Sequence, residues 1–371
     1  MKATIPFRIA QIILALALLR HLWLALYVHP YADDFSYAVA SMETPLAERL
    51  VQEYTSWNGR YFSNILVLRS PLLLGLPEGL WGYRAVAIAL ILCTGYAAYH
   101  FLRVLLPRVQ RASVAMGALA FLLLQLHAMP DASEGFYWYT GAVTYQLANV
   151  LSLFLAANWV QRMREPDRTS LWWYAMQTVL IIAITGSNEV HMAFLVLGHA
   201  ALLFVKWRDE GRWYRPAVAL LSVAVLCGIV VALAPGNSTR EALFPLRHDP
   251  LRTLSYSVAQ TTRFAMVWTM VLVLPSLFFL AFLRKGLRNG MINAFTRPMN
   301  KWLVLALPFA CLFVAMVVTY WPTGLLGQYR TLNMAQFFFL ATWFFALAVW
   351  DQEVFRKQHW GFEQARPVYF Q

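Results

Sequence analysis

The stretch WLVLALPFACLFVAMVVTYW, residues 302–321, is twenty residues long and carries no charged side chain. About 20 consecutive apolar residues in an α-helix span the hydrocarbon core of a bilayer. The stretch therefore predicts a transmembrane helix, and the same reasoning extended along the chain predicts an all-α polytopic bundle of about ten spans. The other apolar runs lie at 7–28, 82–102, 113–129, 141–160, 171–187, 190–206, 216–234, 264–284 and 331–350.

The composition agrees with a membrane domain. Of the 371 residues, 60% are hydrophobic and 13% are charged, whereas a soluble domain carries about 25% charged and 45–50% apolar residues. This balance excludes a soluble enzyme, a disordered chain and a disulfide scaffold. Cys93, Cys227 and Cys311 fall within apolar runs, which predicts neither a disulfide framework nor a metal site. We expect one transmembrane domain over residues 1–350 and a short cytoplasmic tail over 351–371.

Two apolar segments differ from the ordinary spans. The run at 7–28 is long for the core of a signal peptide, contains Arg20 and His21, and has no small-residue cleavage site after it, so we expect an uncleaved signal anchor. The stretch at 61–76 is bounded by an arginine and prolines. It is better suited to an interfacial or re-entrant helix than to a span.

The basic residues give the orientation. The net charge is +12, and an excess of Lys and Arg marks the cytoplasmic loops of membrane proteins. With the N-terminus inside, twenty of the thirty Lys and Arg residues fall in inside segments and nine in outside segments. We therefore expect both termini to be cytoplasmic. Because the basic clusters lie between apolar runs, they indicate topology and not a nucleic-acid partner.

The unusual residues lie on the other face. Five outside loops carry acidic, amide, aromatic or arginine side chains next to the ends of spans, and these loops converge if the helices pack as one bundle. This predicts a site on the outer face, with juxtamembrane helices in the first outside loop at 29–81. The motifs are YADDFSYA (31–38), YTSWNGRYFSN (54–64), MPDASEGFYWYTGAVTYQ (129–146), TGSNEVH (185–191), APGNSTR (234–240) and TGLLGQYR (323–330).

The carboxylates allow more than one interpretation. Asp33 and Asp34 are adjacent and repel each other, so one can have a raised pKa and accept a proton; alternatively, the pair is a solvated turn that caps the next helix. Glu189 lies between two apolar runs, where a charge is costly and usually has a role or a partner, or it faces headgroups. Glu134 precedes an aromatic cluster that fits either an interfacial belt or a platform for a sugar ring.

The outside arginines Arg60, Arg240 and Arg330 can bind phosphate in bidentate fashion, or contact headgroups without specificity. Trp57-Asn58-Gly59 and Pro235-Gly236-Asn237 read as turns that place two of these arginines. No P-loop, dinucleotide-binding or zinc-protease motif occurs, and the spans hold few ionisable residues. Nucleotide-driven and ion-coupled transport therefore find no support in the sequence.

A long first span followed at once by Tyr31-Ala32-Asp33-Asp34 resembles the GT-C superfamily of membrane glycosyltransferases. The motifs WNGRYFSN, SEGFYWYTGAVTY, SNE and APGNSTR are similar to a bacterial group allied with O-antigen glucosyltransferases, and the resemblance covers roughly residues 10–335. It implies a multi-pass protein of the bacterial inner membrane whose site faces the periplasm. Such an enzyme transfers a sugar from a polyprenyl-phosphate donor to a glycan or lipid acceptor, with inversion.

The resemblance also implies roles for residues. Asp33 or Asp34 would be the general base, Arg330 and Arg240 would stabilise the leaving phosphate, and Arg60 would orient the acidic loop. Glu189 and Glu134 would hold hydroxyl groups of the sugar or the acceptor. No cofactor or metal is required, although some relatives use a divalent cation, which the acidic cluster could bind. The larger relatives have a C-terminal soluble domain that is not found here, which leaves room for an accessory membrane subunit. The candidate substrate-binding residues are Trp57, Asn58, Arg60, Glu134, Trp138, Tyr145, Glu189, Asn237, Arg240 and Arg330.

Two other functions fit the same sequence. A transporter or flippase for lipid-linked glycans would need polar groups along a path through the bundle. A noncatalytic membrane partner of an envelope assembly would tolerate mutation of every outside motif. In all three cases membrane lipid is a partner and nucleic acid is not.

Overall fold

The computed structural model describes residues 5–164, 170–292 and 300–355, and nine helices in these ranges are long and apolar enough to cross a membrane. These ranges contain no β-strand. The prediction of an all-α polytopic bundle is therefore confirmed. The nine helices are α1 (Ile5–Ala25), α5 (Glu78–Leu105), α6 (Arg111–Ala128), α8 (Leu147–Arg164), α10 (Glu189–Glu210), α11 (Arg215–Ala232), α13 (Pro250–Arg288), α14 (Lys301–Thr323) and α15 (Tyr329–Trp350).

The tenth expected span, at 171–187, forms the shorter helix α9 (Leu171–Thr185) of 15 residues. Its C-terminal end lies beside α4 (Tyr61–Leu68), because the backbone N–H of Phe62 donates to the carbonyl of Gly186 over 2.9 Å. The stretch at 61–76 forms α4 and the 3₁₀ turn η1 (Pro71–Leu74), both too short to span a bilayer.

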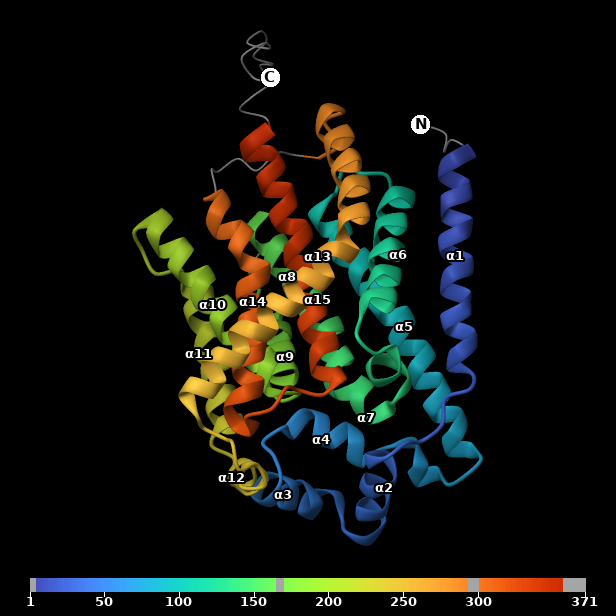
Figure 1. The fold of residues 1–371 in the computed structure, drawn as a ribbon, viewed down its shortest axis with the longest axis vertical. Coiled ribbons are helices and arrows are strands. Elements are labelled where there is room, and N and C mark those ends of the chain that lie inside the picture. Colours follow the sequence, from blue (N-terminus) through green and yellow to red (C-terminus); the bar gives the residue numbers. More distant parts are fainter. Residues whose placement is uncertain (1–4, 165–169, 293–299, 356–371) are drawn as a thin grey trace.

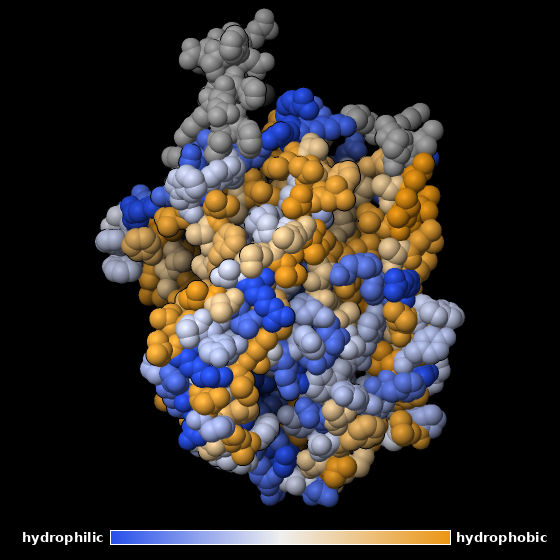
Figure 2. All heavy atoms as spheres, in the orientation of Figure 1, coloured by the Kyte–Doolittle hydropathy of each residue, from blue (hydrophilic) through white to orange (hydrophobic). Residues whose placement is uncertain are grey.

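The two ends of the bundle differ (Figure 1). The start of α1 and the end of α15 lie at one end. The opposite end is covered by α4 and three further short helices, namely α2 (Asp33–Glu43), α3 (Leu46–Ser56) and α12 (Pro235–Glu241). Figure 2 shows a largely hydrophobic belt below the hydrophilic upper rim of the bundle, and a surface of mixed hydrophilic and hydrophobic residues at the end that holds these short helices.

Local sequence explains where several helices begin and end. Side-chain oxygens of Asn188, Asp249 and Asn300 accept hydrogen bonds from backbone N–H groups in the first turns of α10, α13 and α14. Such caps satisfy donors that a helix N-terminus leaves unpaired. Helix α14 ends at Thr323 and is followed by Gly324, which has a φ of 68°. At this position a Cβ atom would also lie 2.3 Å from the carbonyl oxygen of Leu246.

The segment between α6 and α8 connects elements at the end that carries the short helices. It contains the π-helical turns η2 (Ser133–Tyr137) and η3 (Ala142–Gln146) with the short helix α7 (Tyr139–Gly141) between them. This segment packs on α15, α4 and α2. A π-turn carries one extra residue per turn and is frequent at functional sites. The segment thus links the short helices α2 and α4 to α15.

Candidate functional site

Two turns that are far apart in the sequence interlock at this end. The side chain of Asn237 accepts from the backbone N–H of Gly59 over 3.3 Å and donates to the carbonyl of Val231 over 2.8 Å. A Cβ atom on Gly236 would lie 2.3 Å from the backbone nitrogen of Trp57. Glycine at this position therefore lets the two backbones touch. The sequence predicted turns at 57–59 and 235–237; in the structure residues 235–237 form the first turn of helix α12, and the two segments position each other.

The interlocked turns direct two arginines onto one carboxylate. Arg60 binds Glu189 through Nη2 at 2.7 Å and through Nε at 3.0 Å, and Nη2 of Arg240 lies 3.1 Å from the other Glu189 oxygen. Burial disfavours the charge on Arg60, but Glu189 outweighs this effect and raises the pKa of Arg60 above its ordinary value. Asn188 caps α10 and so fixes Glu189 in its first turn.

Arg330 is placed differently. Its backbone N–H donates to a Glu134 carboxylate oxygen over 2.9 Å. Its guanidinium lies 4.5 Å from the centre of the Trp138 ring and 5.9 Å from that of Tyr145. No carboxylate within the described ranges pairs with this guanidinium. Stacking on aromatic faces holds its plane while its N–H donors stay available to an anion.

The adjacent aspartates have different environments. Asp34 is fully buried and accepts from the Thr140 hydroxyl at 2.6 Å, from the Thr140 N–H at 3.1 Å and from the Tyr31 N–H at 3.0 Å. Burial raises the pKa of Asp34, and these hydrogen bonds counteract part of that effect. Asp34 is therefore an internal anchor and not a solvated cap. Asp33 is exposed and lines the cavity described next.

A cavity of about 430 Å³ lies between the short helices and the span ends. One part of its wall is polar and comes from the motifs discussed above. Another part is apolar, and it includes Phe244, Val318 and Pro322. Eight of the twelve candidate residues line this cavity: Asp33, Trp57, Asn58, Arg60, Tyr145, Glu189, Arg240 and Arg330.

The other four candidates lie behind the wall and hold it in place. Asp34 anchors the start of α2, and Trp138 supports this anchor through a 3.0 Å hydrogen bond from its indole N–H to the carbonyl of Tyr31. Glu134 holds the backbone of Arg330, and Asn237 holds that of Gly59. These four residues do not line the cavity in this structure. The catalytic role expected for Asp34 and the substrate-binding roles expected for Glu134, Trp138 and Asn237 stay predictions.

The sequence analysis missed Tyr37, Asn64 and Thr144, which also line the cavity. Tyr37 follows Asp33 by four residues and Asn64 follows Arg60 by four, so helical spacing could have identified both. It also overlooked a buried chain of polar side chains inside the bundle. His191 bonds Asn149 at 3.0 Å, Asn149 donates to Gln146 at 2.9 Å, and Gln146 donates to Thr94 at 3.1 Å. None of these residues is an Asp, Glu, Lys or Arg, so a search for those residue types in spans does not find them.

The donor set does not fit a divalent cation. Glu189 is shared by two arginines and Asp34 is occupied by Thr140 and Tyr31, which leaves Asp33 as the carboxylate of the acidic pair that faces the cavity. No cluster of three or more His, Cys, Asp or Glu residues able to hold a metal occurs within 5–164, 170–292 and 300–355.

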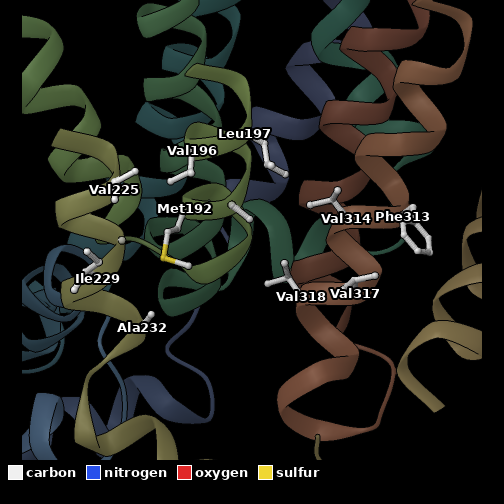
Figure 3. Close-up of a pocket in the computed structure, with 12 residues that line it drawn as sticks. Met192, Val196, Leu197, Val225, Ile229, Ala232, Phe313, Val314, Val317 and Val318 are labelled. Atoms are coloured by element: carbon white, nitrogen blue, oxygen red, sulfur yellow. The ribbon is translucent and has the colours of Figure 1, made fainter. Parts of the chain in front are cut away.

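An apolar groove of about 550 Å³ adjoins the polar cavity. It is formed by α10, α11 and α14, whose side chains face one another across it (Figure 3). Val318 lines both the groove and the cavity, and Met192 lies one helical turn beyond Glu189. The lining residues are Met192, Ala193, Val196, Leu197, Val225, Gly228, Ile229, Ala232, Phe313, Val314, Val317 and Val318.

Comparison of this chain with protein-family models, with curated proteins and with solved structures finds no match. The geometry of the site therefore carries the functional argument.

Proposed function

We propose that this protein is a membrane glycosyltransferase that moves a sugar from a polyprenyl-phosphate donor to an envelope glycan or lipid acceptor. The observation that carries the proposal is the pairing, in one cavity, of the exposed carboxylate of Asp33 with the uncompensated guanidinium of Arg330. The first can accept a proton and the second can stabilise a phosphate.

The charges of the cavity favour an anionic ligand. Arg60, Arg240 and Arg330 contribute three positive charges, and Asp33 and Glu189 contribute two negative charges. Since Glu189 is shared by Arg60 and Arg240, Arg330 is the cation best able to receive a phosphate. The sequence analysis expected Arg60 to orient the acidic loop; in the structure it binds Glu189 and, through Nη1, the hydroxyl of Tyr145 at 3.2 Å.

The apolar groove supports a lipid-linked donor. A lipid phosphate has a charged head and a hydrocarbon chain, and the polar cavity and the groove offer one environment for each, with Val318 common to both. A donor that arrives through the bilayer needs no nucleotide site, which agrees with the absence of nucleotide-binding motifs from the sequence.

The proposed reaction is a single displacement. Asp33 accepts the proton of an acceptor hydroxyl while the hydroxyl oxygen forms a bond to the anomeric carbon. The bond from that carbon to the phosphate oxygen breaks, and its electron pair remains on the phosphate, whose added charge Arg330 stabilises. Attack from the face opposite the leaving group inverts the anomeric configuration. Arg240, held by one oxygen of Glu189, assists the phosphate from the other side.

The proposed function also requires that the cavity lie on the periplasmic side of the membrane. The excess of Lys and Arg in alternate loops favours cytoplasmic termini. The end that carries α2, α3, α4 and α12 then faces the periplasm of a bacterial inner membrane, where lipid-linked sugars meet envelope acceptors.

The decisive experiment is mass spectrometry of envelope glycans and lipid-linked sugars in a deletion strain complemented with wild type or Asp33→Asn. We expect the deletion to remove one sugar and accumulate its lipid-phosphate donor. Wild type should restore the sugar, and Asp33→Asn should lower transfer by about 10²–10⁴-fold, the range for loss of a general base.

Glu43→Gln is the matched control, because Glu43 is an exposed carboxylate on the same helix and does not line the cavity. It should restore transfer fully. Restoration by Asp33→Asn as well would reject the assigned base and favour a transporter or a noncatalytic partner. An unchanged glycan profile in the deletion strain would count against the transferase.

A further inference from the structure

Two tyrosines line the cavity, Tyr37 and Tyr145, and they differ in the partners of their hydroxyls. The hydroxyl of Tyr145 accepts from Arg60, that of Tyr61 donates to the carbonyl of Ile182 at 2.8 Å, and that of Tyr54 donates to the carbonyl of Val230 at 2.9 Å. The hydroxyl of Tyr139 donates to the carbonyl of Leu66 at 2.9 Å. Tyr37 lines the cavity, and its hydroxyl has no hydrogen-bond partner in the part of the chain that the structure describes.

Tyr37 shares the cavity with the residues of the proposed chemistry. It follows Asp33 by one turn of α2, so both side chains belong to the same face of that helix. The charges that act on it are those of Glu53, Arg60, Asp33 and Arg330. It therefore lines the same cavity as the proposed base and the proposed phosphate-binding cations, and feels their charges.

The hydroxyl of Tyr37 remains protonated at neutral pH. The side chain is half-buried, and burial, with the nearby carboxylate of Glu53, raises the pKa of Tyr37 to about 12. A neutral phenol can donate one hydrogen bond and accept another. A donor placed at a cavity wall without a protein partner is suited to a ligand.

We propose that Tyr37 is a specificity-determining residue whose hydroxyl binds a hydroxyl group of the transferred sugar. This inference rests on the proposed function. In a displacement at the anomeric carbon, the sugar occupies the space between the base and the leaving phosphate. Asp33 and Arg330 would mark those two positions, and Tyr37 lines the same cavity one helical turn after Asp33. A site built to bind a substrate hydroxyl discriminates strongly against analogues that lack it.

The test is ligand binding to the purified full-length protein in lipid nanodiscs. The probes are a prenyl phosphate and the same prenyl phosphate linked to glucose, galactose, mannose or N-acetylglucosamine. Wild type should bind at least one of the sugar-linked probes more tightly than the sugar-free probe. Tyr37→Phe should weaken that binding by about 5- to 30-fold, as expected for one hydrogen bond, and leave binding of the sugar-free probe unchanged.

Tyr54→Phe is the matched control, since it removes the same atom from the next helix, where the hydroxyl serves the fold. It should leave both affinities unchanged. Tyr37→Phe should unfold at the wild-type temperature because it breaks no protein hydrogen bond. An equal loss for both probes would place the hydroxyl at the phosphate, and no loss would place it away from the ligand; either result overturns the proposal.

The same binding experiment distinguishes failure of the proposed function from failure of the proposed contact between Tyr37 and the sugar. Wild-type protein that binds none of the probes would reject a lipid-phosphate substrate altogether. Wild-type protein that binds the sugar-free probe as tightly as every sugar-linked probe would overturn the contact between Tyr37 and the sugar, and would leave lipid-phosphate binding in place.

Discussion

Ion pairs connect distant segments at both ends of the bundle, but the balance of charge differs. At the end where α1 begins, Arg284 of α13 binds Asp351, just after α15, with Nε 2.8 Å from the carboxylate. At the other end Arg60 and Arg240 share Glu189, and Arg330 stands nearby without a carboxylate partner in the described residues. The first arrangement ties helices together. The arrangement at the other end leaves an excess of positive charge beside a cavity, and such an excess favours an anionic ligand.

The largest effect should come from removing the shared carboxylate. Glu189→Gln leaves two half-buried arginines without a counter-charge, and we expect a loss of about 2–4 kcal/mol in the free energy of unfolding. The side chains involved are 18–23% exposed, so solvent weakens the effect only in part. Inorganic phosphate should restore much of the lost thermal stability, because an anion can take the place of the carboxylate.

Asp351→Asn is the comparison variant at the opposite end. It should also lower the unfolding temperature, since Asp351 is only 3% exposed, but phosphate should not restore it. Equal rescue of the two variants would show that phosphate stabilises the protein without using the cavity, and the contrast between the two ends would lose its functional meaning.

The next largest effect concerns the interlocked turns. Gly236→Ala introduces a Cβ atom 2.3 Å from the backbone nitrogen of Trp57, and overpacking of this kind costs about 1–3 kcal/mol. The turns must move apart, so Arg60 and Arg240 lose their common alignment on Glu189. We therefore expect Gly236→Ala to lower both the unfolding temperature and the affinity for prenyl phosphate.

Gly198→Ala provides the matched control, because a Cβ atom at this position in α10 meets nothing within 4 Å. Alanine is favoured over glycine inside a helix by about 0.5–1 kcal/mol, so this variant should be slightly more stable. Wild-type behaviour of Gly236→Ala would mean that the close approach of the two turns does not determine the site.

The sequence was sufficient for the spans, because a run of about 20 apolar residues specifies a membrane helix without tertiary information. It also indicated that the outside motifs converge. It could not pair Glu189 with partners 129 and 51 residues away. Nor could it separate Asp33 from Asp34, since the burial of Asp34 depends on Thr140, which is 106 residues further along the chain. The sequence could not predict the apolar groove either, because side chains that line such a groove and side chains that face lipid are both apolar.

A third prediction concerns the arginine that has no carboxylate partner. Arg330→Gln removes a charge-assisted donor, and we expect the affinity for prenyl phosphate to fall by about 10- to 100-fold, corresponding to roughly 1.5–3 kcal/mol. Stability should change little, because the contact of Glu134 with residue 330 is to the backbone N–H. Arg263→Gln on α13, outside the cavity, should leave the affinity unchanged. Equal affinities of Arg330→Gln and wild type would remove this arginine from the phosphate site.

The smallest expected effect is a pH dependence that distinguishes the two neighbouring aspartates. Burial raises the pKa of Asp34 in the folded state above the unfolded value of about 3.9. The folded state then holds the proton more tightly than the unfolded state. The resulting stabilisation is fully present below about pH 3.9 and is lost as the pH rises through the raised pKa. The unfolding temperature of wild type should therefore fall over this interval, whereas that of Asp34→Asn should be flatter. Asp33→Asn should keep the wild-type dependence of unfolding temperature on pH, because Asp34 is intact in this variant.

Parallel curves of unfolding temperature against pH for wild type and Asp34→Asn would show that this carboxyl does not titrate differently on folding. Its role as a buried anchor would then rest on its hydrogen bonds to Thr140 and Tyr31 alone.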